Sequence, residues 1–293
     1  GVLEEESGLK AGEDFHLVAS PERIDPGNPK FTIDKLPKVV GGIDKESLDL
    51  GVAFYSNFIE RVVPVSSLEA AEATKMLENS YRALNIGFIN EFAKYCDAAG
   101  INVVEVIDAA STKPMGFSKH YPGIGVGGHC IPKDPYYLIS SGEEFGVQFT
   151  TLWNGVLSNE SMPYYTMNAM KKAGKDNKVD LENAHIVLFG IAYKGGVRDL
   201  RDSPAVIFHD IVKRERLKIS VYDPMFSREE GEKMGMRWFD PAKEGCDVIV
   251  IGCDHQEFRN FDYSKVKGLK FIIDGKNILH KVDIPVIGIG KRN

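Results

Sequence analysis

The chain has 293 residues, of which 43% are hydrophobic and 27% charged, and its formal net charge is −6. This length allows about two domains, and the composition is that of an ordinary globular protein. An acidic chain without a basic tract is a poor candidate for binding nucleic acid or an anionic membrane, and no apolar run reaches the roughly 20 residues of a membrane span. Four cysteines in a chain this long form no disulfide framework, so we expect a reducing, cytoplasmic setting.

The first 65 residues have the pattern of an α/β layer. Apolar runs predict short strands over residues 15–19, 38–41 and 61–65, and apolar spacing predicts a helix over residues 45–58. The chain opens on Gly1-Val2-Leu3, with no initiator Met and no signal-peptide pattern, which suggests a piece of something longer.

Residues 66–173 have a mostly helical pattern, unlike the residues before them. A long helix begins near residue 66, Gly100 interrupts it, and a second helix is expected over residues 102–110. Residues 113–135 are rich in glycine and proline and are expected to be irregular, and helices are expected again over residues 136–173.

The remainder alternates between strands and helices. A polar stretch over residues 174–183 has the composition of a linker. Strands are then predicted at 184–192, 218–222, 247–252, 270–274 and 285–289, with a helix over residues 203–216 that begins at Ser203-Pro204. Such alternation predicts a parallel sheet covered on both faces.

Cys130 is the strongest single candidate for a catalytic residue. Two glycines precede it, which would let a substrate approach the backbone closely, and Lys133 lies one helical turn further on. A cationic neighbour favours the thiolate, which is the nucleophilic form of cysteine. The same pattern fits a buried structural cysteine. Cys96, Cys246 and Cys253 lie in apolar patterns typical of the core, and no zinc spacing is present.

Two further features are weaker indications of a functional site. Lys75 and Asn79 are four residues apart on the long helix, so they share a face and could present a cation and an amide to an oxyanion, although a solvated helix stripe has the same pattern. The glycine-rich loop 190–204 runs from a strand into a helix and contains Lys194, which suits a nucleotide phosphate, but it is neither a G-x-G-x-x-G fingerprint nor a Walker A loop.

Taken together, five ordered motifs closely resemble the UDP-glucose/GDP-mannose dehydrogenase family over essentially the whole chain. They are Ser20-Pro21-Glu22-Arg23, Lys75-x-x-x-Asn79-x-x-Arg82-Ala83, Gly127-Gly128-His129-Cys130-Ile131-Pro132-x-Asp134-Pro135, Gly190-x-Ala192-Tyr193-Lys194 and Arg201-x-Ser203-Pro204-Ala205.

The resemblance implies an α/β architecture in three parts. Residues 1–65 would be the C-terminal remnant of an NAD-binding Rossmann domain. Residues 66–173 would form a helical central domain that makes a homodimer and carries the cysteine loop. Residues 174–293 would form a Rossmann-like UDP-sugar-binding domain. About 100–150 residues of the NAD domain would be missing upstream.

The resemblance also implies a reaction, which is a four-electron oxidation at C6 of a UDP-sugar. NAD would accept the hydrides, and Cys130 would hold the intermediate as a thiohemiacetal and then a thioester. By the same resemblance, Lys75 and Asn79 would hold the C6 oxygen, Asp134 would orient a water or act as base, and Glu22 would assist thioester hydrolysis.

Binding roles follow from the same motifs. The segment from Tyr121 to Gly125 would cover the sugar diphosphate. The residues implied for the substrate are Tyr121, Gly123, Gly125, Gly128, Lys194 and Lys276, and those implied for NAD are Lys133 and Arg201. Lys276 stands where members often have Arg, and Lys133 stands where N-acetylhexosamine members often have an apolar residue, so both depart from the pattern.

Within the family, Gly128-His129-Cys130 resembles the branch that oxidises UDP-N-acetylglucosamine or UDP-N-acetylmannosamine. The motifs at residues 20–28 and 112–117 favour the glucosamine type. Two alternatives stay open: a UDP-glucose 6-dehydrogenase, and a fragment that only binds UDP-sugar and dimerises. Without an NAD domain, we expect no dehydrogenase activity from this chain alone.

Overall fold

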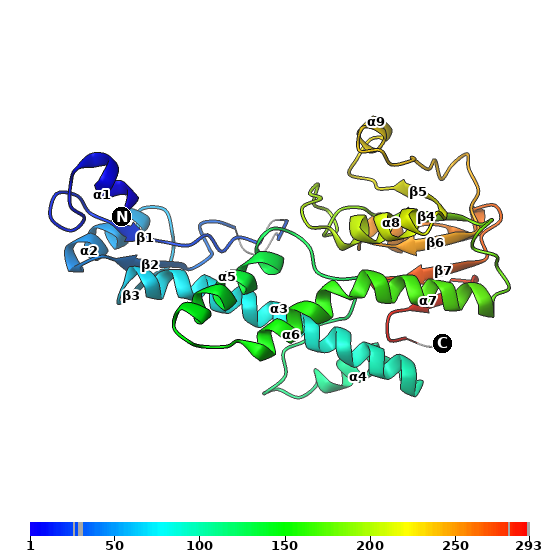
Figure 1. Ribbon diagram of the computed structural model, residues 1–293, viewed down its shortest axis with the longest axis horizontal. Helices are drawn as coiled ribbons and strands as arrows, with labels where there is room; N and C mark the ends of the chain where they lie inside the picture. The colour runs from blue at the N-terminus through cyan, green and yellow to red at the C-terminus, as the bar shows by residue number, and fades with distance from the viewer. Residues whose placement is uncertain (26, 29–31, 281, 292–293) are drawn as a thin grey trace. The chain divides into compact units, whose positions relative to one another are not determined.

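The computed structural model describes residues 1–25, 27–28, 32–280 and 282–291 (Figure 1). The chain forms two compact units, Gly1–Tyr81 and Arg82–Asn293. Pro26, part of the motif expected at residues 20–28, lies outside the described residues.

The first unit is built on a small three-stranded sheet with the order β1-β2-β3. Strand β1 (Val18–Ala19) is antiparallel to β2 (Lys38–Gly42), and β2 is parallel to β3 (Val62–Val65). Its helices are α1 (Val2–Ser7) and α2 (Lys45–Tyr55), and α3 (Leu68–Ala99) begins in this unit. The strand predicted over residues 15–19 is only two residues long, and α1 was not predicted because it is short and buries no residue.

Helices make up the first part of the second unit. After α3 come α4 (Val103–Ala110), α5 (Cys130–Glu144), α6 (Thr150–Glu160) and α7 (Met162–Asp176). Helices α3 and α4 share a buried cluster that includes Ile89, Cys96 and Ile107. None of the helices in the described ranges is long and apolar enough to cross a membrane.

Helix α5 begins earlier than predicted. The prolines led us to expect irregular chain up to residue 135, but the helix starts at Cys130 and contains both Pro132 and Pro135. Pro132 is the third residue of the helix, where a backbone N–H has no partner within the helix, so the missing donor costs little there. The helix therefore places Cys130 at its first position.

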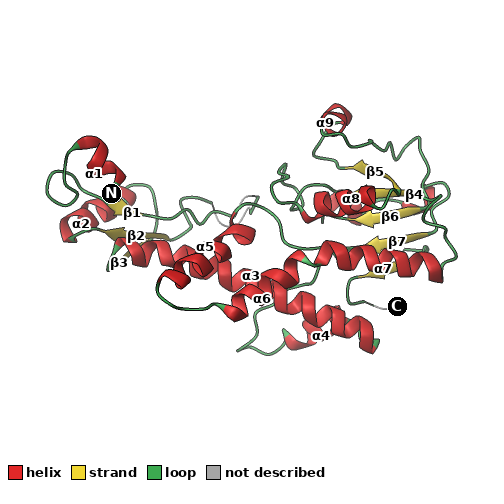
Figure 2. Ribbon diagram, in the orientation of Figure 1, coloured by secondary structure: helices red, strands yellow, loops and turns green. Residues whose placement is uncertain are grey.

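A five-stranded parallel sheet forms the second part of this unit, as predicted (Figure 2). Its order is β5-β4-β6-β7-β8, and all four neighbouring pairs are parallel. The strands are β4 (His185–Phe189), β5 (Lys218–Tyr222), β6 (Val248–Ile251), β7 (Phe271–Asp274) and β8 (Val286–Gly288). The helical elements between them are α8 (Pro204–Arg214), α9 (Arg228–Lys233), α10 (Gln256–Arg259) and η1 (Tyr263–Lys265). Strand β4 ends at Phe189 rather than at residue 192, because Gly190 turns the chain with a φ of +91°.

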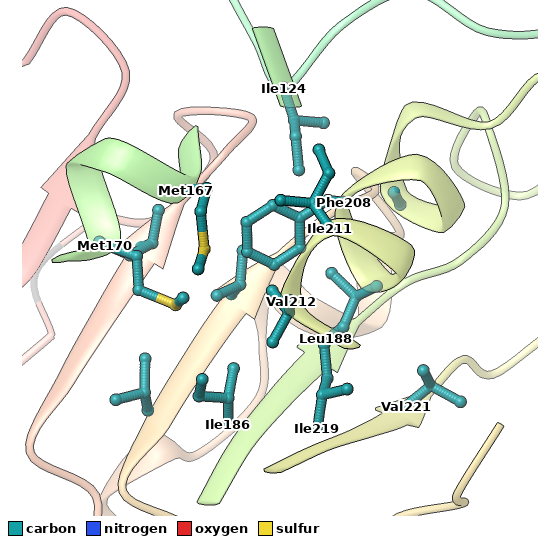
Figure 3. Packing of buried hydrophobic residues seen from close by; sticks show 14 of the residues in the cluster. Ile124, Met167, Met170, Ile186, Leu188, Phe208, Ile211, Val212, Ile219 and Val221 are labelled. Atoms are coloured by element: carbon teal, nitrogen blue, oxygen red, sulfur yellow. The ribbon is translucent and has the colours of Figure 1, made fainter. Parts of the chain in front are cut away.

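Both faces of this sheet are buried. Helices α7 and α8 cover one face, where Met167, Met170 and Phe208 pack on Ile186 and Leu188 (Figure 3). The other face packs against a second cluster that contains Phe239, Phe258 and Tyr263. The first cluster also takes in Ile124, which comes from the loop before α5 and is fully buried. That loop is therefore fixed to the core of the sheet.

The end of the described chain returns to the helices. Gly290 donates its N–H to Asp97 Oδ2 at 3.1 Å and accepts a hydrogen bond from the Val103 N–H at 2.8 Å. Ile289 is fully buried in the cluster between α3 and α4. Residues at the C-terminal end thus complete the core of helices formed much earlier in the chain.

Candidate functional site

The order of the strands points to one edge of the parallel sheet. Strand β4 connects to β5 on one side, whereas its other neighbour, β6, connects to β7 on the opposite side, so the connections that follow β4 and β6 run in opposite directions. In open α/β sheets, ligands bind outside the carboxyl ends of the strands at such a switch point. Here the loops that follow β4 and β6 touch closely. A Cβ added to Gly252 would lie 2.5 Å from the Gly190 carbonyl oxygen, so glycine is required.

The backbone of the loop after β4 is held by buried acceptors. The N–H groups of Ile191 and Ala192 donate to Asp223 Oδ2 at 2.8 and 3.0 Å. The Gly195 N–H donates to Asp254 Oδ1 at 2.9 Å, and the Gly196 N–H donates to His255 Nδ1 at 3.2 Å. These four N–H groups are committed to protein partners, which leaves the loop poorly suited to cradle a phosphate with its backbone. A phosphate contact from this loop would come from a side chain such as that of Lys194.

Two of these acceptors are stabilised as carboxylates. Burial raises the pKa of Asp254, but the charge of Lys276 and the Gly195 N–H outweigh it, so the pKa is lowered overall. Burial likewise raises the pKa of Asp223, but His255 and the backbone N–H groups bring it below its usual value. Lys276 follows β7, which ends at Asp274, so the lysine lies at the same carboxyl edge of the sheet as the loop after β4.

The loop containing Gly123 and Gly125 covers this edge. Ile124 donates its N–H to the Gly275 carbonyl at 2.8 Å, and Gly123 donates to Asn90 Oδ1 at 3.0 Å. Asn90 is fully buried and is itself held by Asn159 at 2.9 Å. Sequence patterns did not indicate either asparagine. A Cβ on Gly123 would lie 3.5 Å from Cδ of Lys276, so the loop runs beside the stem of that side chain.

The glycines at 123, 125 and 128 also have the letters of the dinucleotide fingerprint G-x-G-x-x-G, a match that our sequence reasoning missed. No described strand precedes them, as that fingerprint requires. An added Cβ would lie 2.8 Å from Pro204 at Gly125 and 2.9 Å from the Tyr193 ring at Gly128. These glycines therefore allow close packing against the 193–204 segment, and they do not form an open cradle for a pyrophosphate.

Cys130 lies next to the same segment. The Gly128 N–H donates to the Arg201 carbonyl at 2.9 Å, which joins the cysteine loop to the loop after β4. Cys130 is partly exposed, and its Sγ lies 3.9 Å from His129 Nδ1. Since Cys130 is the first residue of α5, a thiolate there would sit at the positive end of the helix dipole.

Cys96, Cys246 and Cys253 are buried, as their apolar patterns predicted. Burial raises the pKa of Cys246 and of Cys253 to about 12. Among the described residues, no cluster of side chains could hold a metal ion.

The two residues predicted for NAD both form ion pairs. Lys133 Nζ lies 3.2 Å from Asp202 Oδ2, and Arg201 forms a fork with Asp199, with its NH2 at 2.7 Å from Oδ2. Asp199 and, more weakly, the Cys130 sulfur raise the pKa of the Arg201 guanidinium.

Two other predicted residues are held in place. Asp134 is only 5% exposed and lies inside α5, so it faces protein more than solvent. The Tyr121 hydroxyl donates to Asp108 at 2.5 Å, and Lys119 lies 5.0 Å from the centre of its ring. The tyrosine ring, 42% exposed, remains the part available to a ligand.

The remaining predicted residues belong to the first unit. Glu22 Oε1 accepts the N–H groups of Arg23 and Ile24 at 2.7 and 2.8 Å, and Lys38 lies 3.3 Å from its other oxygen. Burial raises the pKa of Glu22, but these donors lower it overall. Arg23 pairs with Glu78, which fixes the Glu22 loop to the turn of α3 that carries Asn79.

Lys75 and Asn79 lie on α3 and are both partly exposed. The three predicted residues Glu22, Lys75 and Asn79 belong to the Gly1–Tyr81 unit, whereas Cys130, Asp134, Lys194 and the others belong to the Arg82–Asn293 unit.

Known proteins are similar to this chain in sequence and in fold. Two domain profiles match, the central domain of the UDP-glucose/GDP-mannose dehydrogenase family at residues 69–161 and its UDP binding domain at residues 187–281. A UDP-N-acetyl-D-mannosamine dehydrogenase of Pyrococcus horikoshii is 35% identical over 99% of this chain and 68% of its own length. The chain belongs to the UDP-glucose/GDP-mannose dehydrogenase family. The solved structure of UDP-D-ManNAc dehydrogenase from P. horikoshii superposes with a TM-score of 0.88, at 34% identity, over 99% of this chain and 68% of that one.

A second member of the family has a different sugar in its name. The UDP-N-acetyl-D-glucosamine 6-dehydrogenase of Pseudomonas aeruginosa is 33% identical over 92% of this chain and 64% of its own length. Across such relatives the chain spans between 60 and 68% of their length. The matched profiles fall inside the predicted parts 66–173 and 174–293, whose boundaries stay a prediction.

Members of this family use NAD. A dinucleotide needs an open glycine turn between a strand and a helix. In the first unit, β2 ends on Gly41 and Gly42 before the turn into α2, but a Cβ on Gly41 would lie 2.1 Å from the Ser67 carbonyl oxygen and one on Gly42 would lie 2.4 Å from the Leu48 nitrogen. That turn is filled by the protein itself. The described part of the chain therefore provides no cradle for the NAD pyrophosphate.

Proposed function

We propose that this chain carries the sugar-nucleotide site and the reactive thiol of a UDP-N-acetylhexosamine 6-dehydrogenase. One observation carries the proposal: the Gly128–Arg201 hydrogen bond attaches the Cys130 loop to the switch-point edge of the sheet in the UDP-binding domain. A sugar nucleotide held at that edge would extend toward the thiol.

In the proposed reaction, Cys130 Sγ forms a bond to the C6 aldehyde carbon and the aldehyde oxygen takes up a proton, giving a thiohemiacetal. Once this is oxidised to a thioester, water adds to the carbonyl carbon, the C–S bond breaks, and the carboxylate and the free thiolate are released while the two protons of the water pass to solvent. NAD is the family's oxidant. We assign no hydride step to the described residues, because they offer it no cradle.

Roles for the other residues follow from charge and position. Lys194 and Lys276 are the cations proposed for the diphosphate, and the Tyr121 ring and the 123–128 backbone are proposed to cover the sugar. Lys75 and Asn79 are proposed to donate to the C6 oxygen as it gains charge. Glu22, already held as a carboxylate, is proposed to orient water during hydrolysis.

For the substrate, we propose UDP-N-acetylmannosamine first and UDP-N-acetylglucosamine second. The motifs at residues 20–28 and 112–117 favoured glucosamine, but the mannosamine sugar appears in the name of the P. horikoshii relative and of its solved structure. Both sugars have an N-acetyl group at C2 and differ in its configuration.

We propose that the protein is a homodimer that works in the cytoplasm. Helix α3 presents Phe88, Phe92 and Tyr95 at the spacing of one helix face, and Phe88 and Tyr95 are more than half exposed. Such a face is typical of a partner surface. All four cysteines are free, which suits a reducing compartment. Sedimentation analysis of the chain and of Phe88→Glu tests the dimer; a monomeric wild-type chain would exclude it.

The first test is calorimetric binding of UDP, UDP-glucose and the two UDP-N-acetylhexosamines to this chain. We expect binding that depends on the UDP part and is tightest for one N-acetylated sugar. Absence of binding by all four would overturn the proposal. Equal affinity for UDP and every sugar would support the alternative that these residues bind the nucleotide and dimerise without selecting the sugar.

The second test concerns the thiol. In the protein expressed from its complete gene, Cys130→Ser is expected to abolish formation of the uronic acid, with a loss of at least about a thousandfold, because an alcohol replaces the thiolate. Cys246→Ser, at a buried thiol, is the control expected to keep the rate. Normal acid formation by Cys130→Ser would exclude the nucleophile. The 293-residue chain alone is expected to produce no NADH.

A further inference from the structure

His255 and Asp223 form a buried pair beneath the loop after β4. Both side chains are 0% exposed, and His255 Nε2 lies 3.1 Å from Asp223 Oδ2. The edge of the Phe258 ring closes the site on one side, with ring centres 5.3 Å apart. An ionisable pair so far from solvent is costly to bury unless its hydrogen bonds are satisfied, and both members of this pair have further partners.

The hydrogen bonds determine the protonation of the imidazole. The Gly196 N–H can only donate, so Nδ1, 3.2 Å away, must be the acceptor and carry no proton. The proton then sits on Nε2, which donates to Asp223. His255 is therefore a neutral bridge with one tautomer, linking a buried carboxylate to the backbone of the loop.

Together, Asp223 and His255 form what we call the clamp, which holds the loop after β4 on both sides of Lys194. Asp223 holds the loop at Ile191 and Ala192, and His255 holds it at Gly196. Lys194 lies between them. The N–H groups on both sides of it, at Ala192 and Gly195, donate to protein acceptors, so we take the side chain of Lys194 as the group that this part of the loop would present to an anion.

We propose that His255 is a positioning residue that fixes the loop so that the Lys194 ammonium meets the diphosphate of the bound nucleotide. The inference rests on the proposed function, because it needs a UDP-sugar at this edge. A lysine on an already ordered loop loses less conformational entropy on binding than one on a loose loop. Loss of the clamp should therefore weaken the contact with the diphosphate while leaving contacts with the nucleoside unchanged.

Two conservative variants separate the roles of the two ring nitrogens. His255→Asn keeps an acceptor near the place of Nδ1, whereas His255→Gln keeps a donor near the place of Nε2 and loses the acceptor for Gly196. We expect Gln to weaken UDP binding about tenfold or more, which corresponds to about 1.4 kcal/mol, and Asn to restore most of it. Uridine affinity should change less than about threefold in both variants.

His185 provides a matched control at the opposite end of the same sheet. It is also buried, 7% exposed, and its ring bonds Ser220 Oγ at 2.8 Å and the Gly245 carbonyl at 3.2 Å. We expect His185→Gln to lower the melting temperature while leaving UDP affinity unchanged. Equal loss of UDP affinity in the His185 and His255 variants would mean that only general stability is involved, and it would overturn the inference.

A double-mutant cycle with Lys194→Met decides whether His255 acts through the lysine. If it does, His255→Gln should cause little further loss of UDP affinity once Lys194 is gone. Fully additive losses would overturn the inference while leaving UDP binding by the wild-type chain, and hence the proposed function, intact. Failure of the unchanged chain to bind UDP would instead overturn the proposed function, and the inference with it.

Discussion

The two ends of the five-stranded sheet use similar polar residues for different purposes. At the amino end, the ring of His185 bonds Ser220 and the Gly245 carbonyl. The backbone N–H of His185 donates to Asp247 Oδ2 at 2.8 Å. These partners lie in the strands and in the turn before β6. At the carboxyl end, the partners of Asp223 and His255 are mostly N–H groups of loops. The amino end ties strands together, whereas the carboxyl end fixes loops.

The buried charge of this sheet lies at its carboxyl edge. Asp223 and Asp274, each 1% exposed, both follow or end strands at the carboxyl edge. A buried carboxylate destabilises a fold unless donors surround it. The donors here are the loops that the proposed site requires, so the acids and the loops depend on each other.

The largest effect is expected from removing a carboxylate at the carboxyl end. Asp223→Ala leaves His255 and three backbone N–H groups without their acceptor. We expect a loss of about 3–5 kcal/mol in the free energy of unfolding. At the amino end, Asp247→Ala removes the acceptor of one N–H and should cost about 1 kcal/mol. Urea denaturation of both variants measures the difference, and equal losses would remove the distinction between the two ends.

A smaller effect concerns pH, and it separates two acids at the same edge. The pKa of Asp223 is lowered in the folded state, so its stabilising contribution is present above its ordinary value of 3.8 and is lost as the pH falls through the folded pKa. Burial raises the pKa of Asp274, so its contribution is present below 3.8 and is lost as the pH rises through the folded pKa.

Replacement by asparagine tests these opposite signs. The destabilisation caused by Asp223→Asn should shrink as the pH is lowered, whereas Asp274→Asn should compare more favourably with wild type as the pH is raised. Unfolding free energies measured between about pH 3 and pH 7 give both trends. Parallel trends for the two variants would contradict the assignment.

The smallest effect is expected at the surface of the site. Lys133 and Asp202 are 48% and 39% exposed, so their ion pair is largely solvated. Lys133→Ala should change the free energy of unfolding by about 0.5 kcal/mol or less. A loss above about 2 kcal/mol would mean that this pair, and not the buried Gly128–Arg201 contact, holds the cysteine loop.

The fold could be predicted mainly where the pattern is strong. Apolar runs such as residues 184–189 can only be buried strands when they alternate with helices, and the 32-residue helix α3 has no proline to interrupt it. The predicted start of α5 was wrong because proline was taken as a break, although the first turn of a helix tolerates Pro132 and this helix also continues through Pro135. Short polar elements such as α9 carry no apolar period that a sequence pattern could reveal.

The candidate site was predictable in part. Cys130 and Lys194 stood out through neighbouring glycines and charge. Asn90 lies inside a long helix, where nothing in the sequence distinguishes it from a surface residue. Asp223 and His255 had a usable signal, since each follows a predicted strand at its carboxyl end, where parallel sheets place ligand sites. Their role as acceptors for loop N–H groups depends on distances that the sequence does not contain.

The attachment of Gly290 to Asp97 has a consequence for how the protein is made. The helical core around Ile89 and Cys96 is synthesised first, and Gly290, which attaches to Asp97, follows that residue by 193 positions in the chain. Contacts so distant in sequence form slowly, because a long loop must close before they contribute. Part of the apolar surface of these helices therefore stays exposed until residues 286–291 have been synthesised. A shortened chain that lacks residues 286–291 would keep that surface exposed to chaperones and to aggregation.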